Sequence, residues 1–283
     1  MPHQPTAELE RKLDRLRRDL HALGSVLVAF SGGADSAFLL AAAVRALGAD
    51  RVAAATAESA SLPRAELDDA ATFAADLGVR HLTPATDEMS SAGYVANAGN
   101  RCYFCKAELL DVLIALADSL GLRHVATGTN ADDTKAGFRP GIRAASERGA
   151  VTPLLDAGFS KDDVRRASRQ WGLVTADKPA AACLSSRIAY GLAVTPQRLA
   201  RVERAEVALR SALVTEGFDV RDLRVRDLGD AARVEIDADL VDILLARPDL
   251  LAAVLGFDEV TVDPRGFRSG SMNELLADPV AYR

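Results

Sequence analysis

Short apolar runs alternate with amphipathic segments through the first part of the chain. The run SVLVAF at residues 25–30 is continuously apolar, which is typical of a strand buried on both faces of a parallel sheet. Between such runs, apolar residues recur at helical spacing. The predicted strands span residues 25–30, 51–59, 79–85 and 124–130, and the predicted helices span residues 36–48, 64–78 and 105–121. This alternation predicts βαβ units, with helices on both faces of a parallel sheet.

Further helices are predicted before the first strand and after the fourth. Leucines within residues 9–23 recur at intervals of four and three residues, so they share one face of an amphipathic helix. Ser160 as a capping residue, with Asp162 and Asp163 in the first turn after it, predicts a helix over residues 160–172. Residues 131–151 carry Gly, Pro and charges without an apolar period, and we expect an active-site loop there.

The pattern changes after about residue 190. Thr195 as a capping residue and Pro196 at the first helical position predict a long helix over residues 195–217. Two neighbouring strands, a second helix and a third strand follow, at residues 220–227, 232–237, 238–256 and 259–266. The order α-β-β-α-β predicts a smaller α+β domain. We therefore expect one domain over residues 1–190 and a second over residues 191–283.

Composition narrows the class of protein. The chain has 283 residues, of which 49% are apolar and 26% charged, so it can bury a sizeable core. No apolar run approaches the ~18–20 residues of a membrane span, and the N-terminal segment lacks the apolar stretch of a signal peptide. Three cysteines in a chain of this length do not make a disulfide framework. We expect a cytoplasmic protein with no membrane partner.

The net charge of −6 also bears on partners. Proteins that bind nucleic acid without sequence preference usually carry a basic patch, with a domain pI above ~9. The acidic balance therefore predicts no nucleic-acid partner. Apolar faces of the second domain could pair subunits, and we expect a homo-oligomer.

A polar loop, SGGADS at residues 31–36, separates the first predicted strand from the next helix. Backbone N–H groups at a helix N-terminus bind phosphate oxygens, assisted by the helix dipole. The loop lacks the lysine of the common phosphate-binding loop. Asp35 would repel a phosphate unless a divalent cation lay between them, so the loop favours Mg²⁺ on a pyrophosphate group. A simple glycine turn between strand and helix is the alternative.

The three cysteines lie in informative contexts. Cys102 and Cys105 form a CxxC pair at the start of a predicted helix, and Cys183 lies near the expected domain boundary. The spacing favours metal or redox chemistry over core packing, and a helix N-terminus favours the thiolate form. Zinc would require a fourth ligand. An iron–sulfur cluster on three cysteines would leave one iron open, and that iron could hold a sulfide.

Charged residues in the second half of the chain provide further candidates. Arg224 and Arg226 are two residues apart on a predicted strand, so both side chains point to one face and could bind a phosphate. Arg187 follows the third cysteine closely and could do the same. Glu206 and Glu235 are candidate cation ligands. Solvated surface positions are the alternative for all of them.

Two segments of the chain, at residues 31–36 and 127–133, resemble motifs of a known superfamily. SGGADS resembles the PP-loop of N-type ATP pyrophosphatases, which split ATP between the α and β phosphates and adenylate a substrate. TGTNADD, at residues 127–133, resembles the second nucleotide-side segment of that superfamily. The resemblance implies Mg²⁺ near Asp35 and Asp133. It implies ATP contacts at Ser31, Gly32, Gly33, Asp35, Ser36, Ala55, Thr56, Gly128, Thr129 and Asn130.

A wider set of motifs resembles the LarE family, the ATP-dependent sulfur transferases of nickel-pincer nucleotide synthesis. SGGADS, NRCYFCK, GTNADD, CLSSRIAYG and RGFRSGSMNE occur in that order. The resemblance implies a PP-loop domain followed by a smaller domain for substrate binding or oligomerisation. It implies that ATP adenylates pyridinium-3,5-biscarboxylic acid mononucleotide and that sulfur then attacks the acyl-adenylate. The product later carries nickel in lactate racemase and related enzymes.

The family has two sulfur sources, and the resemblance implies a choice between them. A sacrificial cysteine would be Cys183, whereas Cys102, Cys105 and Cys183 together match the type that carries a [4Fe–4S] cluster. The presence of all three favours the cluster. Arg187, Arg224 and Arg226 would hold the substrate phosphate. A tRNA thiolase of the same superfamily, an ammonia-using synthetase and a non-catalytic nucleotide-binding module are the alternatives.

Overall fold

The computed structural model describes residues 7–135, 140–179 and 182–276, which form two compact units. The first unit comprises residues 7–88 and 102–179, and the second comprises residues 89–101 and 182–276, each within the described ranges. The chain therefore enters the second unit early, leaves it, and returns. The functional boundary expected at residues 190 and 191 stays a prediction.

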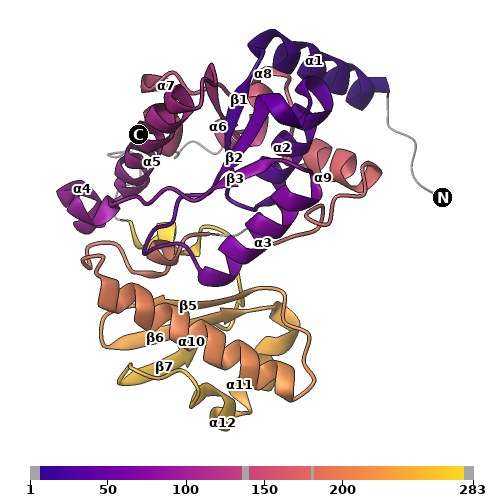
Figure 1. Ribbon diagram of the computed structural model, residues 1–283. Coiled ribbons are helices and arrows are strands. Elements are labelled where there is room, and N and C mark those ends of the chain that lie inside the picture. Colours follow the sequence, from indigo (N-terminus) through magenta and orange to yellow (C-terminus); the bar gives the residue numbers. More distant parts are fainter. Residues whose placement is uncertain (1–6, 136–139, 180–181, 277–283) are drawn as a thin grey trace. The chain divides into compact units, whose positions relative to one another are not determined.

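A four-stranded parallel sheet forms the centre of the first unit (Figure 1). Its order is β3-β2-β1-β4, with Val26 in register with Val52 on one side and with His124 on the other. The strands are β1 (Val26–Ala29), β2 (Val52–Ala55), β3 (Arg80–Leu82) and β4 (His124–Thr127). The predicted α/β class is confirmed. Because the chain runs outward from β1 to β3 and then crosses to β4, the order reverses between β1 and β4, where ligands of such sheets bind.

Helices cover both faces of this sheet. Val26 and Val28 point into the core shared with α1, α2, α3 and α9, whereas Leu27 points into the core shared with α5 and α7. This alternation explains why the first strand is apolar at every position. The helices are α1 (Ala7–Leu23), α2 (Ala34–Leu47), α3 (Arg64–Asp76), α5 (Arg101–Ser119), α6 (Ala131–Lys135), α7 (Pro140–Glu147), α8 (Pro153–Asp156) and α9 (Lys161–Gln170).

The segment expected to be a loop at residues 131–151 is helical over most of the part that the structure describes. It forms α6 and α7. The buried face of α7 consists of Pro140, Ala144 and Ala145, which carry little hydrophobic area each. The Pro and Gly residues at its start are typical of a loop and led to the loop prediction, although the helix packs against the core.

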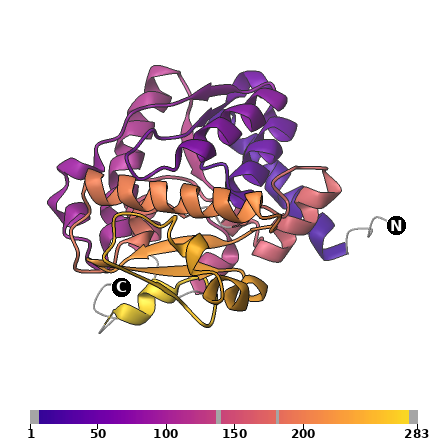
Figure 2. The ribbon, with the colours of Figure 1, turned by 90° about the horizontal axis from the view of Figure 1, so that it is seen from below.

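The second unit contains a three-stranded sheet of order β5-β6-β7. Strands β5 (Leu223–Asp227) and β6 (Ala231–Ile236) are antiparallel, and β7 (Glu259–Val262) pairs parallel to β6. Helix α10 (Pro196–Thr215) runs along this sheet (Figure 2) and buries Leu209 and Leu213 against it. Thr195 caps α10 by accepting the N–H of Arg198 at 3.2 Å, as the sequence predicts. Helix α4 (Ala92–Val95) also belongs to this unit.

The prediction of a single helix over residues 238–256 is wrong. The structure contains a 3-10 turn at Ala238–Leu240, then α11 (Val241–Leu245) and α12 (Pro248–Leu251). Pro248 has no N–H to continue the helix, and it forces Arg247 out of the helical region, with φ −123° and ψ 71°. Among the described residues, no helix has both the length and the apolar character needed to cross a membrane.

Candidate active site

The glycine loop joins β1 to the N-terminus of α2. Gly32 has φ +70°, a conformation that favours glycine. Ser36, in the first turn of α2, donates from Oγ to the Gly33 carbonyl at 3.1 Å and accepts the N–H of Ser31 at 3.3 Å. The loop is thus folded back on the positive end of the helix dipole. Its N-cap, Gly33, has no side chain to occupy the first amides, so the geometry suits an anion.

The second predicted nucleotide segment packs directly on this loop. A Cβ atom at Gly128 would lie 2.9 Å from the Ser36 nitrogen and 3.1 Å from the Asp35 carbonyl carbon. Only glycine allows this backbone-to-backbone approach. Because β4 lies beside β1, residues 31–36 and Gly128 meet at the carboxyl ends of the two strands. The structure therefore brings together two segments that are almost a hundred positions apart in the sequence.

The residues after Gly128 also stabilise the local fold. Asn130 Oδ1 accepts the N–H groups of Asp132 and Asp133 at 3.0 and 3.3 Å, and Asp133 Oδ2 accepts the N–H of Asn130 at 3.2 Å. These contacts cap α6. Thr129 Oγ1 lies 3.1 Å from Thr127 Oγ1. Contacts of Thr129 and Asn130 with a nucleotide stay a prediction.

Asp35 lies in a mixed electrostatic environment. Burial raises the pKa of its carboxyl group, and the charge of Asp133 raises that pKa further. Lys161 and Arg165, both on α9, act in the opposite direction. Two neighbouring carboxylates are suitable ligands for Mg²⁺, which takes its other ligands from phosphates and water. Sequence reasoning did not identify Lys161 and Arg165, because only the packing of α9 places them near the glycine loop.

The residues at the end of β2 are buried. Thr56 is 2% exposed; its Oγ1 donates to the Phe30 carbonyl at 2.7 Å and lies 2.8 Å from His81 Nε2. Burial lowers the pKa of His81, so the ring is neutral near pH 7. Ala55 is part of the core shared with α5. Ala55 pairs with strands on both sides, and Thr56 hydrogen-bonds to residues of both neighbouring segments. Contact of Ala55 and Thr56 with adenine stays a prediction.

Cys102 and Cys105 share one face of α5, because residues three apart are neighbours on a helix. The Cys105 thiol donates to Glu88 Oε1 at 3.8 Å, and Glu88 is only 5% exposed. Lys106 follows directly, and burial lowers the pKa of its ammonium group. This end of α5 therefore combines two thiols, a buried carboxylate and a lysine.

Cys183 belongs to the second unit and precedes a 3-10 turn at Leu184–Arg187. Its Sγ lies 3.0 Å from Ser185 Oγ. No disulfide joins the three cysteines, all of which the structure describes. Within the described ranges, no three His, Cys, Asp or Glu side chains are grouped closely enough to hold a metal ion. The CxxC pair lies in the first unit and Cys183 in the second, and binding of a cluster by all three cysteines stays a prediction.

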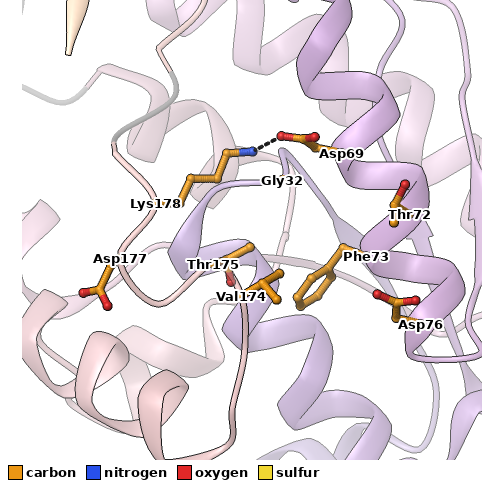
Figure 3. Close-up of a pocket in the computed structure, with 9 residues that line it drawn as sticks. All are labelled: Gly32, Asp69, Thr72, Phe73, Asp76, Val174, Thr175, Asp177 and Lys178. Carbon is orange, nitrogen blue, oxygen red and sulfur yellow. Dashed lines mark hydrogen bonds and ion pairs between the residues drawn. The ribbon is translucent and has the colours of Figure 1, made fainter. Parts of the chain in front are cut away.

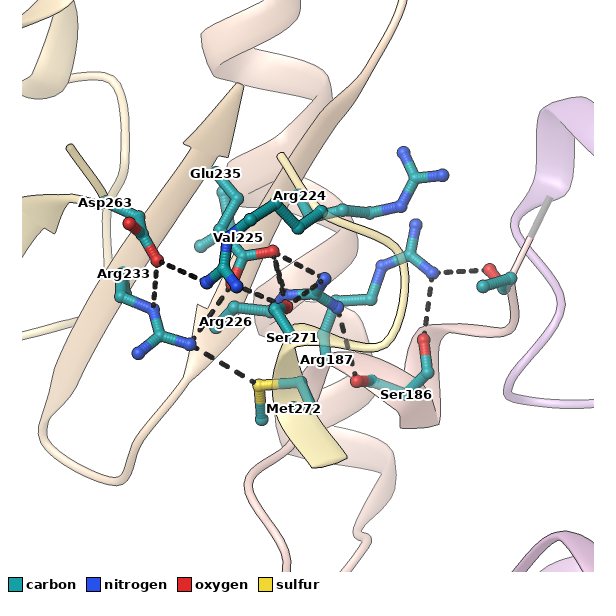
Figure 4. A network of polar contacts seen from close by, with 12 residues as sticks. Ser186, Arg187, Arg224, Val225, Arg226, Arg233, Glu235, Asp263, Ser271 and Met272 are labelled. Atoms are coloured by element: carbon teal, nitrogen blue, oxygen red, sulfur yellow. Dashed lines mark hydrogen bonds and ion pairs between the residues drawn. The ribbon is translucent and has the colours of Figure 1, made fainter. Parts of the chain in front are cut away.

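The second unit contains a cluster of the three predicted arginines. Arg187 forms a bidentate ion pair with Glu206, with Nε–Oε1 at 2.9 Å and Nη2–Oε2 at 3.1 Å. Arg226 Nη2 lies 2.6 Å from Glu235 Oε2 (Figure 4). Metal binding by Glu206 or Glu235 stays a prediction, and a cation there would have to compete with these arginines.

Arg224 is the most perturbed member of this cluster. Burial, followed by the charge of Arg187, lowers the pKa of its guanidinium to about 10. Its charged group lies 5.1 Å from the Phe267 ring centroid, and Nη1 donates to the Leu223 carbonyl at 2.8 Å. An anion bound here would offset the repulsion between the guanidinium groups.

The tail segment contributes to the same cluster. Ser271 Oγ donates to both carboxylate oxygens of Glu235 at 2.8 Å and accepts a hydrogen bond from Arg226 at 3.1 Å (Figure 4). Sequence reasoning did not identify Ser271 or Phe267 as contacts. Their positions depend on the return of the chain to β6 after β7.

Known proteins are similar to this chain along nearly its whole length, which includes residues of both units. The family model described as NAD synthase matches residues 7–100, which include the glycine loop. An uncharacterized protein of Synechocystis sp. is 42% identical over 273 residues, which cover 95% of this chain and 99% of that protein. The pyridinium-3,5-bisthiocarboxylic acid mononucleotide synthase of Lactiplantibacillus plantarum is 37% identical over 273 residues, covering 95% of this chain and 96% of the synthase. With a PP-loop at the switch point of its sheet and this similarity along nearly the whole sequence, the chain belongs to the LarE family of PP-loop proteins.

Proposed function

We propose that this protein inserts sulfur into pyridinium-3,5-biscarboxylic acid mononucleotide, in an ATP-dependent reaction that serves nickel-pincer cofactor synthesis. Similarity to the synthase of Lactiplantibacillus plantarum over 95% of the chain is the observation that carries this proposal. Family membership implies ATP and Mg²⁺. The close packing of Gly128 on the glycine loop supports a shared nucleotide site at residues 31–36 and 128–130.

The chain's own groups suit the adenylation step. The backbone of the glycine loop would bind the β and γ phosphates at the N-terminus of α2. Asp35 and Asp133 would hold Mg²⁺, which neutralises charge on the departing pyrophosphate. A carboxylate of the substrate would then attack the α phosphate, forming an acyl-adenylate and releasing pyrophosphate.

We assign the substrate phosphate to Arg187, Arg224 and Arg226. Arg187 and Arg226 pair with Glu206 and Glu235, whereas burial and the charge of Arg187 lower the pKa of Arg224, so the cluster suits a further anion. Planar guanidiniums bind phosphate through paired hydrogen bonds, which also orient the ligand. Binding the phosphate here would fix the position of the pyridinium ring and its carboxylates.

We assign the sulfur chemistry to Cys102, Cys105 and Cys183. Three thiolates suit a [4Fe–4S] cluster, which when bound would supply an open iron able to hold a sulfide. Cys183 as a sacrificial donor is the alternative. Anaerobic reconstitution with iron and sulfide, followed by visible absorption, tests the cluster, and Cys102→Ser is expected to prevent it. Loss of the Cys183 sulfur after turnover, detected by mass spectrometry, would instead support sacrifice.

The decisive test of the proposal is substrate-dependent release of pyrophosphate. ATP, Mg²⁺ and the biscarboxylic acid mononucleotide are incubated with the protein, and the mononucleotide with a single carboxylate at position 3 serves as a comparison substrate. Release that depends on the added mononucleotide supports adenylation. An absence of pyrophosphate with both substrates would refute it.

We further propose that the protein acts as a homo-oligomer and has no nucleic-acid partner. The exposed Val207 and Val214 lie seven residues apart on α10, so they share one helix face and support self-association. The net charge of −6 supports the absence of a nucleic-acid partner, because phosphate backbones bind basic surfaces. Light scattering would measure the mass of the assembly, and filter binding with bulk tRNA would reveal any salt-sensitive association.

A further inference from the structure

A cavity of about 560 Å³ opens beside the glycine loop in the first unit. Gly32 forms part of its wall, and Lys178 lies opposite α3 on the other side (Figure 3). Thr72 and Phe73 of α3 complete this part of the lining. The loop itself contains no lysine, so a side-chain cation that assists Mg²⁺ at a bound phosphate has to come from elsewhere in the fold.

Two carboxylates hold the ammonium group of Lys178. Its Nζ lies 2.8 Å from Glu66 Oε2 and 3.0 Å from Asp69 Oδ2. The same Glu66 oxygen lies 3.8 Å from the position that a Cβ atom would take at Gly32. One carboxylate therefore contacts the lysine and also lies close to the glycine loop. The Lys178 side chain is 19% exposed and can still be reached from the cavity.

The backbone around Lys178 is fixed from the opposite side. Arg165 of α9 donates from Nη1 to the Ala176 carbonyl at 2.8 Å and from Nη2 to the Lys178 carbonyl at 3.1 Å. The backbone of Lys178 is thus held by α9, while its side chain reaches α3 beside the glycine loop. Burial alone would lower the pKa of Lys178, but hydrogen bonds and charges from Glu66 and Asp69 outweigh it and raise the pKa, so the group stays charged.

We propose that Lys178 is the phosphate-binding cation that the glycine loop lacks, and that Glu66 and Asp69 hold it in position when no nucleotide is bound. An ammonium group has three N–H donors, so one can reach a β or γ phosphate oxygen while Glu66 still accepts another. A compact point charge suits a phosphate in this way. This inference rests on the proposed binding of ATP at residues 31–36.

Two substitutions distinguish this inference from a purely structural role of Lys178, because they are expected to change the ligand affinity in opposite directions. Lys178→Met removes the cation, and the affinity for Mg²⁺-ATP and for inorganic pyrophosphate is expected to fall roughly 10- to 100-fold. Glu66→Gln keeps a hydrogen-bond acceptor for Lys178 but removes a negative charge beside the loop. Its affinity for both ligands is expected to rise roughly two- to fivefold. A simple link between α3 and residues 176–178 would weaken binding in both variants.

Isothermal titration calorimetry on the full chain measures these affinities, and thermal melting checks the fold. Lys12→Met is the matched control: Lys12 also bridges two carboxylates, Glu8 and Asp163, and is 22% exposed, but it lies on α1 and does not line the cavity. Its affinity is expected to stay within twofold of the wild type.

The measured affinities decide between the inference and its alternatives. Opposite shifts for Lys178→Met and Glu66→Gln support the inference. Unchanged affinity in Lys178→Met, or parallel losses in the two variants, would overturn it while the proposed function stands. If Lys178→Met does not fold, Glu66→Gln decides alone, since tighter pyrophosphate binding supports the inference and unchanged or weaker binding overturns it. A wild-type protein that binds neither ligand would overturn the inference and the proposed use of ATP together.

Discussion

Gly128→Ala tests the contact that joins the two nucleotide segments. The added Cβ atom would lie 2.9 Å from the Ser36 nitrogen and 3.1 Å from the Ser36 Cα and the Asp35 carbonyl carbon. All three neighbours are backbone atoms, so no side chain can turn away to make room. The carboxyl end of β4 and the first turn of α2 must therefore move apart by some tenths of an ångström.

Forcing one methyl group into such a packed position costs about 1–3 kcal/mol. In a protein of this size each kcal/mol lowers the melting temperature by roughly 2–4 °C, so a decrease of roughly 2–12 °C is expected. The same movement displaces the loop amides, and we expect the affinity for Mg²⁺-ATP to fall at least tenfold. Calorimetry and differential scanning measure the two effects.

Gly141→Ala is the matched control for this substitution. A Cβ atom there meets its nearest neighbours at 3.5 and 3.6 Å, an ordinary contact, and Gly141 lies within α7, where alanine is favoured over glycine. The control is expected to melt at or slightly above the wild-type temperature. A Gly128→Ala protein that matched the wild type in both melting temperature and nucleotide affinity would show that the two segments are not tightly joined.

Two further predictions follow from the electrostatics. Because burial raises the pKa of Asp35, the folded protein binds this proton more tightly than the unfolded chain, and ionised Asp35 destabilises the fold at neutral pH. Asp35→Asn should therefore raise the melting temperature without ligand at pH 7, by an amount that shrinks as the pH falls, while weakening Mg²⁺-ATP binding; a lower melting temperature at pH 7 would contradict this. Because burial lowers the pKa of Arg224 to about 10, substrate affinity should fall as the pH approaches that value, more steeply than in Arg224→Gln, and equal pH profiles by titration would exclude Arg224 from the phosphate site.

Much of the fold follows from local spacing along the chain. The run at residues 25–30 and its successors predict buried parallel strands, and the structure confirms them as the central sheet. The break at Pro248 was also present in the sequence, but the apolar pattern on both sides led to a single predicted helix. Helix α7 was missed for the opposite reason, since the Pro and Gly residues at its start indicate a loop although the helix continues through them.

Some relations within the candidate site also follow from local spacing, whereas others do not. Spacing alone places Cys102 and Cys105 on one helix face and puts Asp35 in the first turn after the glycine loop, because these relations span fewer than four residues. The pairing of Arg187 with Glu206, and of Arg226 with Glu235, joins residues 19 and 9 positions apart. In a single sequence these arginines and glutamates are indistinguishable from a solvated charged surface.

The sequence by itself therefore determined the strands of the central sheet, the glycine turn and the thiol pair, since the backbone period and the chemistry of neighbouring residues decide them. Only the tertiary structure decided which distant groups surround the turn. Gly128 reaches Ser36 because β4 pairs with β1, and Lys178 reaches Glu66 because α9 anchors its backbone beside α3. Contacts of this kind depend on sheet order and helix packing, which the whole core determines through burial, and no local pattern encodes them.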